Sequence, residues 1–556
     1  MKLKSTARYL VISLIGLVLL LAWRERLEPP PSYDIIIRHG TIYDGSGSKP
    51  FVADIAIQHD TIAAIGDLPD ATGKNEIDAR GLAVSPGFIN MLSWADQNLL
   101  KDGRSLSNIK QGVTLEVFGE GWSPGPLKRR TSVKADSLWT TLGGYFNYLM
   151  KKGVSPNVAS FVGQTSVRDY VMGQENRKPT IAELDQMKKL VDQAMQEGAL
   201  GLGTSLIYAP ASYASTEELI ELARVASRHG GIFTTHMRSE GDFILDALNE
   251  TFHIARAANI PVEIYHLKIN IARNWNKIDT LISKIDSAQK AGLKISADMY
   301  TYTASGTGLT ARLPLWVQEG GGKEMRKKLR NPSLHKKVLY EMKMGIPYKN
   351  SDPHDVMIMG FRLDSLNRLY RGKRLDEIAR LHGKNADETT LDLIVRDRSR
   401  IEAIYYQVSE ENMKRLMQLP YVSFGSDAGS QAIPENAAQI GAHPRTYGTF
   451  ARFLGKYVRE EKLMPLEEAI RRLTSLPARN LNITKRGALR VGQFADIAVF
   501  NPFSIQDHAT FENPHQYASG MMHVFVNGIQ VLANGEHTGA LPGRIIRGSG
   551  KKNIKI

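Results

Sequence analysis

The feature that most constrains this chain is a regular alternation of strand-like and helix-like segments through its middle. Strand-like runs occupy residues 113–118, 230–236, 261–266, 294–298 and 421–427, and residues 181–197 and 215–228 between them have helical periodicity. Alternation of this kind produces a parallel sheet, either doubly wound or closed into a (β/α)8 barrel.

Polar residues at the ends of these strand-like runs favour the barrel. The residues that end or closely follow a run are Glu120, His236, His266, Asp298 and Asp427. In barrels, the carboxyl ends of the strands carry the chemistry. We therefore predict an α/β fold, a TIM-like (β/α)8 barrel over residues 85–484, with a charged insertion at about 317–384.

Short β-branched runs at both ends of the chain predict a second, smaller unit. Residues 33–84 and 485–548 both contain such runs, bounded by Gly and Asp. Neither part buries a sizeable core alone, so we expect them to join in one small β-sandwich. Residues 549–556 form a basic tail.

The first 32 residues predict export. Basic residues precede an apolar run at 9–23, and three prolines follow it as a linker. A helix over this run would rise about 22 Å, which is short of a ~30 Å hydrocarbon core. The length fits a signal peptide or a short membrane anchor. We expect a periplasmic protein, or one attached to the membrane through residues 9–23 and facing the exterior; cleavage is left open.

The composition limits which catalytic groups, metal ligands and partners the protein can have. The 556-residue chain has no cysteine and a net charge of +14. Disulfides and thiol catalysis are therefore excluded, and any metal must be held by His, Asp or Glu. The basic residues are scattered and not interleaved with aromatic residues, so we expect no nucleic-acid partner. Net positive charge suits a small anionic substrate.

Glu120, His236 and His266 are the candidate metal ligands. A barrel would bring the two imidazoles together, because they end separate strands 30 residues apart. Two His and one Glu leave a position of a tetrahedral zinc open for water. Zinc lowers the pKa of that water toward ~7, which gives hydroxide at neutral pH. His and Glu also suit iron, manganese and cobalt, so the prediction is one divalent metal ion, with zinc favoured.

Asp427 is the candidate general base, and then the acid that protonates the leaving amine. Alone, each of these residues has an ordinary interpretation: a polar residue at a strand end, a turn at Glu120, or a helix cap at Asp427. The prediction of a metal-dependent catalytic site rests on these residues taken together.

Ten motifs occur in an order and spacing similar to those of one known family. They lie at 34–45, 86–90, 111–114, 201–213, 236–240, 265–268, 300–314, 425–427, 443–445 and 513–547. The chain resembles the N-acyl-D-amino-acid deacylase (D-aminoacylase) group of the amidohydrolase superfamily over about residues 33–548. The resemblance implies a TIM-like barrel with a β-sandwich from both chain ends. It also implies hydrolysis of the linear amide of N-acyl-D-amino acids to a carboxylate and a D-amino acid.

The resemblance also implies site residues. His236 and His266 match the two His ligands of the family's tight metal site, and Asp427 matches its catalytic Asp. Lys268 and Arg445 fall at substrate-binding positions, where a cation would meet the substrate carboxylate. Tyr300 is a third candidate for this contact, and Arg238 is a further candidate near the metal.

Two departures from the family pattern matter. Leu92, Ser93 and Trp94 stand where the family has His-x-His. Positions two apart share a face of a strand, so both inward-facing His are replaced, and we expect no second metal. Glu120, in a Gly-Glu-Gly-Trp run, stands one position before the Cys of the family's Gly-Asn-Cys-Gly run. We hypothesise that its longer side chain reaches the same metal.

Two alternatives stay open. One is a different amidohydrolase reaction on a cyclic amide, a D-residue dipeptide or a peptidoglycan fragment. The other is a non-catalytic barrel that lost its second metal site. Because function belongs to the site rather than to the fold, the sequence leaves the acyl chain, the amino-acid side chain, D versus L selectivity and the oligomeric state open.

Overall fold

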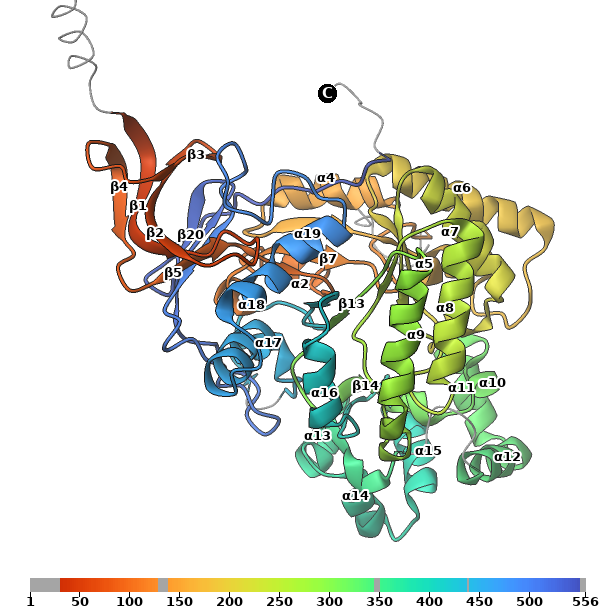
Figure 1. Ribbon diagram of the computed structural model, residues 1–556. Helices are drawn as coiled ribbons and strands as arrows, with labels where there is room; N and C mark the ends of the chain where they lie inside the picture. Colours follow the sequence, from red (N-terminus) through yellow and green to blue (C-terminus); the bar gives the residue numbers. More distant parts are fainter. Residues whose placement is uncertain (1–30, 129–138, 345–350, 438–439, 551–556) are drawn as a thin grey trace, which may run out of the picture.

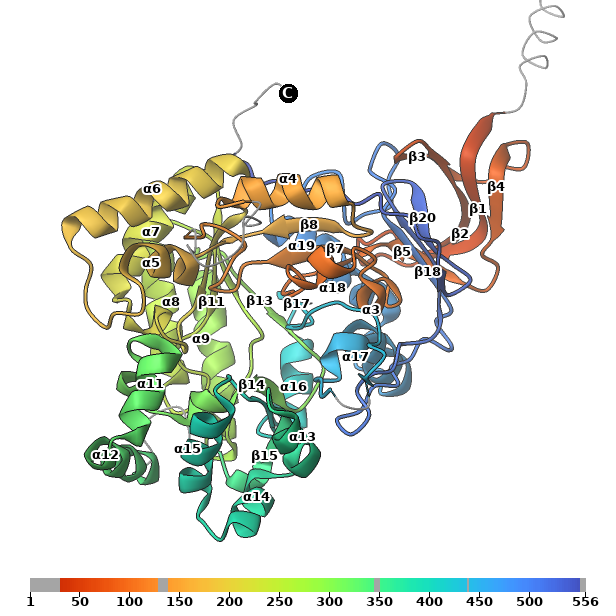
Figure 2. The same cartoon turned by 180° about the vertical axis from the view of Figure 1, so that it is seen from behind.

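The computed structural model describes residues 31–128, 139–344, 351–437 and 440–550. The apolar run at 9–23, predicted to direct export, lies outside these residues. Within them, no helix has the length and apolar character needed to cross a bilayer. Figures 1 and 2 show the strands of the two chain ends at one side of the molecule and helices α11–α15 at the other.

The two ends of the chain share one sheet. Its order is β21-β20-β19-β18-β5-β1-β2-β3, with β4 beside β1. Strand β18 pairs antiparallel with β5, and this pairing joins the C-terminal part to the N-terminal part. The strands are β1 (Ser32–Ile42), β2 (Phe51–Gln58), β3 (Thr61–Gly66), β4 (Thr72–Asp78), β5 (Ala83–Pro86), β18 (Ile497–Phe500), β19 (Met521–Val526), β20 (Ile529–Ala533) and β21 (Glu536–His537).

The middle of the chain forms two parallel sheets. One has the order β17-β13-β12-β11-β10-β9 and the other β6-β7-β8. The strands are β6 (Phe88–Asn90), β7 (Val113–Phe118), β8 (Asn157–Ser160), β9 (Val162–Gly163), β10 (Gly201–Ser205), β11 (Ile232–His236), β12 (Val262–Ile264), β13 (Ile295–Met299) and β17 (Val422–Phe424). Their residues are almost all buried, as expected of parallel strands covered on both faces.

Backbone contacts link the two parallel sheets at both edges. Only Phe161 separates β8 from β9, and its N–H donates to Phe118 O of β7 at 2.8 Å. At the other edge, Met91 N–H, just after β6, donates to Phe424 O of β17 at 3.2 Å. The same two segments continue side by side, because Trp94 N–H donates to Ala428 O at 2.9 Å.

Helices follow the parallel strands in turn. They are α2 (Asn98–Lys101), α3 (Leu106–Ile109), α4 (Leu142–Lys152), α5 (Gln164–Met172), α6 (Ile181–Glu197), η1 (Ala211–Tyr213), α7 (Thr216–Arg228), α8 (Ile244–Ala258), η2 (Ala272–Lys277), α9 (Ile278–Lys290), α16 (Glu410–Met417), α17 (Arg445–Arg452), η6 (Phe453–Glu460), α18 (Leu466–Leu473) and α19 (Ser475–Asn480). The predicted helices are confirmed: Thr180 and Glu183 form a capping box at the start of α6, and Ser215 caps α7.

The insertion is a small unit with its own core. It comprises β14 (Ser305–Gly308), η3 (Leu309–Arg312), α10 (Leu315–Gln318), α11 (Gly321–Arg330), α12 (Pro332–Lys343), η4 (Pro353–Asp355), β15 (Val356–Gly360), α13 (Asp364–Tyr370), α14 (Leu375–His382), α15 (Ala386–Asp397) and β16 (Glu402–Tyr405). It extends beyond the predicted 317–384, because β14 and β15 both pair antiparallel with β16. The Ser-Gly-Thr-Gly sequence of β14 carries little strand signal.

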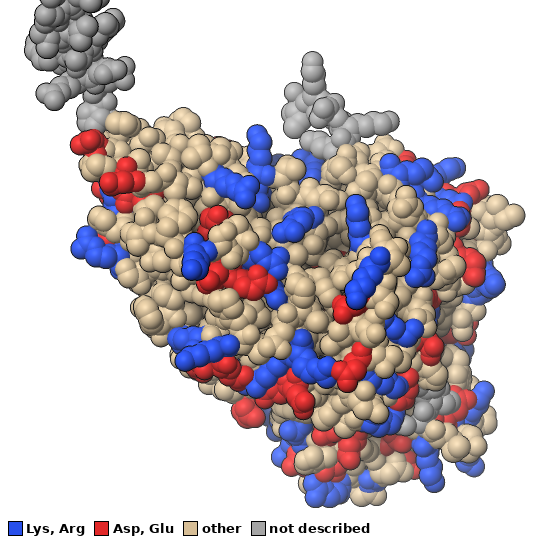
Figure 3. All heavy atoms as spheres, viewed as in Figure 1, with Lys and Arg blue, Asp and Glu red and all other residues tan. Residues whose placement is uncertain are grey.

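Charge is spread over the surface. On the face shown in Figure 3, Lys and Arg side chains alternate with Asp and Glu rather than gathering in one basic patch.

Candidate active site

Glu120, His236 and His266 meet at the carboxyl ends of β7, β11 and β12. Glu120 Oε1 lies 2.8 Å from His236 Nδ1 and 3.2 Å from His266 Nε2, and the two ring nitrogens are 3.0 Å apart. All three residues are buried. Ligand atoms of a tetrahedral zinc are about 3.3 Å apart, since each lies about 2.0–2.2 Å from the ion. The three donor atoms therefore fit one metal ion.

The local backbone conformation orients the side chains of these candidate ligands. Glu120 lies between Gly119 and Gly121, whose φ angles are 107° and 71°. A Cβ on Gly121 would lie 2.6 Å from Ser205 Cβ, so the turn has no room for a side chain there. His266 itself has φ 35°, a conformation that non-glycine residues rarely adopt and that is typical of functional sites.

Charges around the ligands support metal binding. Burial alone would raise the pKa of Glu120, but hydrogen bonds with His236 and His266 outweigh burial and lower that pKa. Burial and the Lys268 cation would lower the pKa of His266, but the carboxylates of Glu240 and Glu120 raise it to about 10. The two imidazoles thus favour the anionic form of Glu120, which is the form that binds a metal ion.

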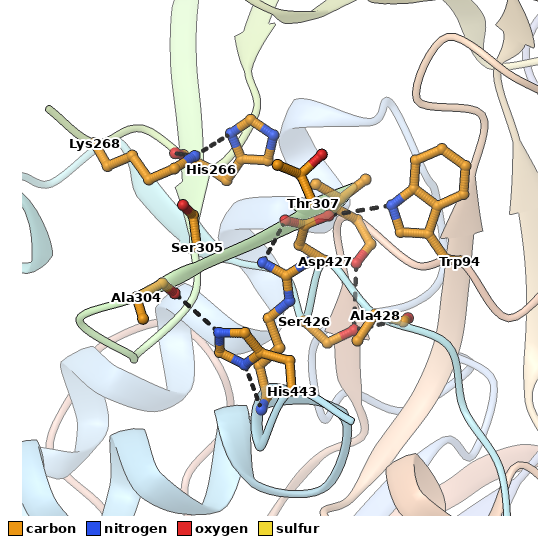
Figure 4. A network of polar contacts seen from close by, with 12 residues as sticks. Trp94, His266, Lys268, Ala304, Ser305, Thr307, Ser426, Asp427, Ala428 and His443 are labelled. Atoms are coloured by element: carbon orange, nitrogen blue, oxygen red, sulfur yellow. Dashed lines mark hydrogen bonds and ion pairs between the residues drawn. The ribbon is translucent and has the colours of Figure 1, made fainter. Parts of the chain in front are cut away.

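Asp427 follows β17 and lines the same cavity as the three ligands. Its Oδ1 accepts a hydrogen bond from Trp94 Nε1 at 3.1 Å, and its Oδ2 lies 2.7 Å from Arg445 Nη1. Figure 4 shows the Trp94 indole pointing at the Asp427 carboxylate. Asp427 has φ 47°, so a second site residue adopts the rare left-handed conformation.

Lys268, Tyr300 and Arg445 lie together, as the prediction requires. Lys268 Nζ is 5.5 Å from the centre of the Tyr300 ring, and Arg445 Cζ is 4.8 Å from it. Among the described residues, the Tyr300 hydroxyl is buried and finds no hydrogen-bond partner. Burial raises the pKa of Tyr300, so this hydroxyl stays a donor. The arrangement presents one free donor between two cations.

Arg238, a further candidate near the metal, has its partners elsewhere. Its guanidinium contacts Glu250 at 2.9 Å and donates to the backbone oxygens of Ser212 and Ala214, both at 3.0 Å. It does not appear among the residues that line the cavity in the described part of the chain. Arg238 therefore holds the loop after β10.

The site opens into a cavity of about 580 Å³. Glu120, His236 and His266 line this cavity, and so do residues of the insertion, including Arg312, Arg400 and Tyr405. A cavity of this size holds a small molecule.

Glu240 is a site residue whose role sequence reasoning missed. Its Oε1 lies 2.5 Å from Lys268 Nζ and 2.9 Å from His266 Nδ1, the nitrogen that faces away from Glu120. Figure 4 shows the neighbouring contact of Lys268 with the His266 ring. The available signal was its place four residues after His236, but the partner of Glu240 comes from a different strand, so spacing could not identify it.

The comparisons with known proteins agree with this geometry. A model described as amidohydrolase family matches residues 362–532. A D-aminoacylase of Alcaligenes xylosoxydans xylosoxydans is 34% identical over 92% of this chain and 97% of its own length.

Solved structures extend the comparison. An N-acyl-D-glutamate deacylase of Bordetella bronchiseptica, complexed with zinc and a phosphonate inhibitor, has a TM-score of 0.77 and 29% identity, covering 93% of this chain and all of its own. A D-aminoacylase structure with a binuclear metal centre, activated by one metal and attenuated by the second, has a TM-score of 0.77 and 32% identity, with the same coverage. This chain belongs to the amidohydrolase family, as a homologue of the D-aminoacylases and N-acyl-D-amino-acid deacylases.

Proposed function

We propose that this protein hydrolyses the linear amide of N-acyl-D-amino acids and releases a carboxylate and a D-amino acid. The observation that carries the proposal is the meeting of Glu120, His236 and His266 in a cavity that also contains Asp427. The relatives that this chain matches over most of its length carry out this class of reaction.

Glu120, His236 and His266 would hold one divalent metal ion, most simply zinc. Such an ion supplies a Lewis acid for the amide carbonyl and lowers the pKa of water. The fit rests on the spacing of the three donor atoms and on the anionic state of Glu120.

The other residues supply binding and proton transfer. Asp427 takes a proton from the attacking water and returns it to the amine nitrogen as the amide bond breaks. Lys268 and the Tyr300 hydroxyl bind the carboxylate of the amino-acid part, with Arg445 beside Tyr300. Charge-assisted contacts of this kind fix the substrate so that its amide faces the metal site.

The architecture supports the same proposal. We propose that β6–β13 and β17 close into one (β/α)8 barrel, with β8 and β9 counted as a single strand interrupted at Phe161. The hydrogen bonds of Phe161 and Met91 at the edges of the two sheets support this closure. All three candidate ligands then lie at the carboxyl ends of barrel strands, where barrel enzymes have their sites.

Residues 1–32 direct export in this proposal, to the periplasm or to a membrane-attached form facing the exterior. The support is the basic start and the apolar run at 9–23. Fractionation of cells that express the full chain tests it: recovery in the cytoplasm would contradict export.

The enzymatic test combines metal content and turnover. The full chain, its His236→Ala variant and its Asp427→Ala variant are analysed for bound metal and assayed on N-acyl-D-amino acids, their L-enantiomers, cyclic amides and D-dipeptides. The proposal expects about one metal per chain in the parent and in Asp427→Ala, none in His236→Ala, and turnover of D-substrates by the parent only. A parent that binds no zinc, or that cleaves only cyclic amides or dipeptides, would overturn it.

A further inference from the structure

Trp94 makes a polar contact that its place in the sequence does not suggest. It follows β6 on the wall of the cavity, two residues after the fully buried Leu92. Its indole Nε1–H donates to Asp427 Oδ1 at 3.1 Å, a normal hydrogen-bond distance. The side chain therefore does more than fill space: it holds one oxygen of the predicted proton carrier.

The backbone fixes this contact from both sides. Asp427 N–H donates to Leu92 O, and Trp94 N–H donates to Ala428 O, both at 2.9 Å. The segments that carry the indole and the carboxylate are thus paired along their length.

Each carboxylate oxygen of Asp427 has a different partner. Arg445 Nη1 forms an ion pair with Oδ2 at 2.7 Å, and Trp94 Nε1–H donates a hydrogen bond to Oδ1. Arg445 also lies against Tyr300, where the proposed substrate carboxylate binds, so Arg445 has a second role beside its contact with Asp427. The indole N–H of Trp94, in contrast, donates to Asp427 alone.

The residues around Asp427 do not fit a second metal ion. Among the described residues, Glu120, His236 and His266 are the one cluster with ligand atoms close enough for an ion. Leu92 and Trp94 offer no lone pair to a metal, whereas D-aminoacylase has a binuclear centre. A neutral N–H also differs from a metal cation, because it orients a carboxylate with less loss of its basicity.

We infer that Trp94 is a positioning residue for Asp427: its indole N–H orients the carboxylate in a site that holds a single metal ion. This inference rests on the proposed deacylase function. In this site, Trp94 supplies the orientation and occupies one lone pair of Oδ1, and a remaining lone pair of the carboxylate accepts the proton of the attacking water.

The first test detects the contact itself and needs neither metal nor substrate. The full chain has six tryptophans, so its ¹⁵N-indole spectrum is simple. The Trp94 signal is the one lost in Trp94→Phe. In Asp427→Ala it should move upfield and exchange faster with water. The signal of Trp275, whose indole donates to Gln407 O at 3.1 Å, should stay unchanged as the reference. A Trp94 signal unaffected by Asp427→Ala would refute the contact.

The second test measures how the contact between Trp94 and Asp427 affects kcat. Trp94→Phe keeps an aromatic ring but removes the N–H. We expect kcat to fall at least tenfold, with KM within twofold of the parent and metal content unchanged. Trp139→Phe loses an indole hydrogen bond to Pro124 O at 2.8 Å, and neither Trp139 nor Pro124 is among the described residues that line the cavity, so this control should keep the parent kcat. An unchanged kcat in Trp94→Phe, with an active parent, would overturn the inference alone. An inactive parent would instead overturn the proposed function, and the spectrum would still decide whether the contact exists.

Discussion

Glu240 Oε1 lies 2.9 Å from Nδ1 of His266, the nitrogen that faces away from Glu120, and 3.8 Å from Nε2 of His236. A carboxylate in this place fixes the tautomer and the orientation of a metal-binding histidine, so that Nε2 faces the ion. The same carboxylate is paired with Lys268, and both groups are buried. Glu240 therefore links the proposed metal site to the proposed carboxylate-binding site.

Replacing Glu240 by Gln should weaken metal binding. The side chain keeps its size but loses the charge that orients His266, and losses of this kind typically cost 10- to 100-fold in metal affinity. Competition between the metal-free protein and a chelator measures this directly. Glu250→Gln is the matched control, because Glu250 pairs with Arg238 away from the cavity and should leave zinc affinity unchanged. Equal affinities in the parent and Glu240→Gln would contradict the assigned role.

Replacing Tyr300 by Phe should weaken binding of the substrate carboxylate. A hydrogen bond to a charged group contributes about 1.5–3 kcal/mol, so kcat/KM should fall roughly 10- to 150-fold. An analogue whose carboxylate is converted to an amide should show little difference between parent and variant. Because burial raises the pKa of Tyr300 above its usual value of 10, the hydroxyl stays protonated, and the loss should be the same at pH 7 and pH 9.5.

Tyr302→Phe is the control for that experiment. Its hydroxyl is also buried but donates to Asp507 at 3.2 Å, outside the cavity. Its kcat/KM should match the parent. A loss in Tyr300→Phe that persists with the amide analogue would show that the hydroxyl does not bind the carboxylate.

Replacing Arg238 by Ala should affect stability and not substrate binding. The change leaves Glu250 and two backbone oxygens without their donor, at a cost of about 1–3 kcal/mol in the free energy of unfolding. Urea denaturation measures this cost, and KM should stay within twofold of the parent. Arg238→Lys retains the charge without the planar fork and should recover only part of the stability. A large rise in KM with unchanged stability would return Arg238 to the list of substrate contacts.

Residues at strand ends were predictable from sequence, and contacts across strands were not. The candidate ligands Glu120, His236 and His266 could be brought together from the sequence because each ends or closely follows a strand-like run, and parallel strands bring such ends together. Arg238, two residues after His236, looked equally well placed. The structure turns it toward α8, because Glu250 and the loop after β10 supply its partners.

Long-range hydrogen bonds explain the other differences. Leu92 and Trp94 were interpreted as apolar replacements, but the indole N–H of Trp94 contacts a residue 333 positions away in the sequence. The insertion was predicted too short, since β14 lacks strand-forming residues and is held in place by β16, nearly a hundred residues further on. Periodicity reports local structure and carries no information about such partners.

Glu120 offers the sharpest test of the metal site. Glu120→Gln should lose the metal, because a neutral amide cannot replace the carboxylate as a ligand between His236 and His266. The double change Glu120→Asn and Gly121→Cys restores the Asn-Cys order of the family's Gly-Asn-Cys-Gly run, yet it should not restore metal binding. A Cβ at position 121 would lie 2.6 Å from Ser205 Cβ and 2.8 Å from Thr165 Oγ1, with the backbone at φ 71°. Elemental analysis of both variants measures the metal bound per chain. About one metal per chain in the double variant would mean that the turn accepts Cys. Steric exclusion would then not explain why Glu120 stands in this chain.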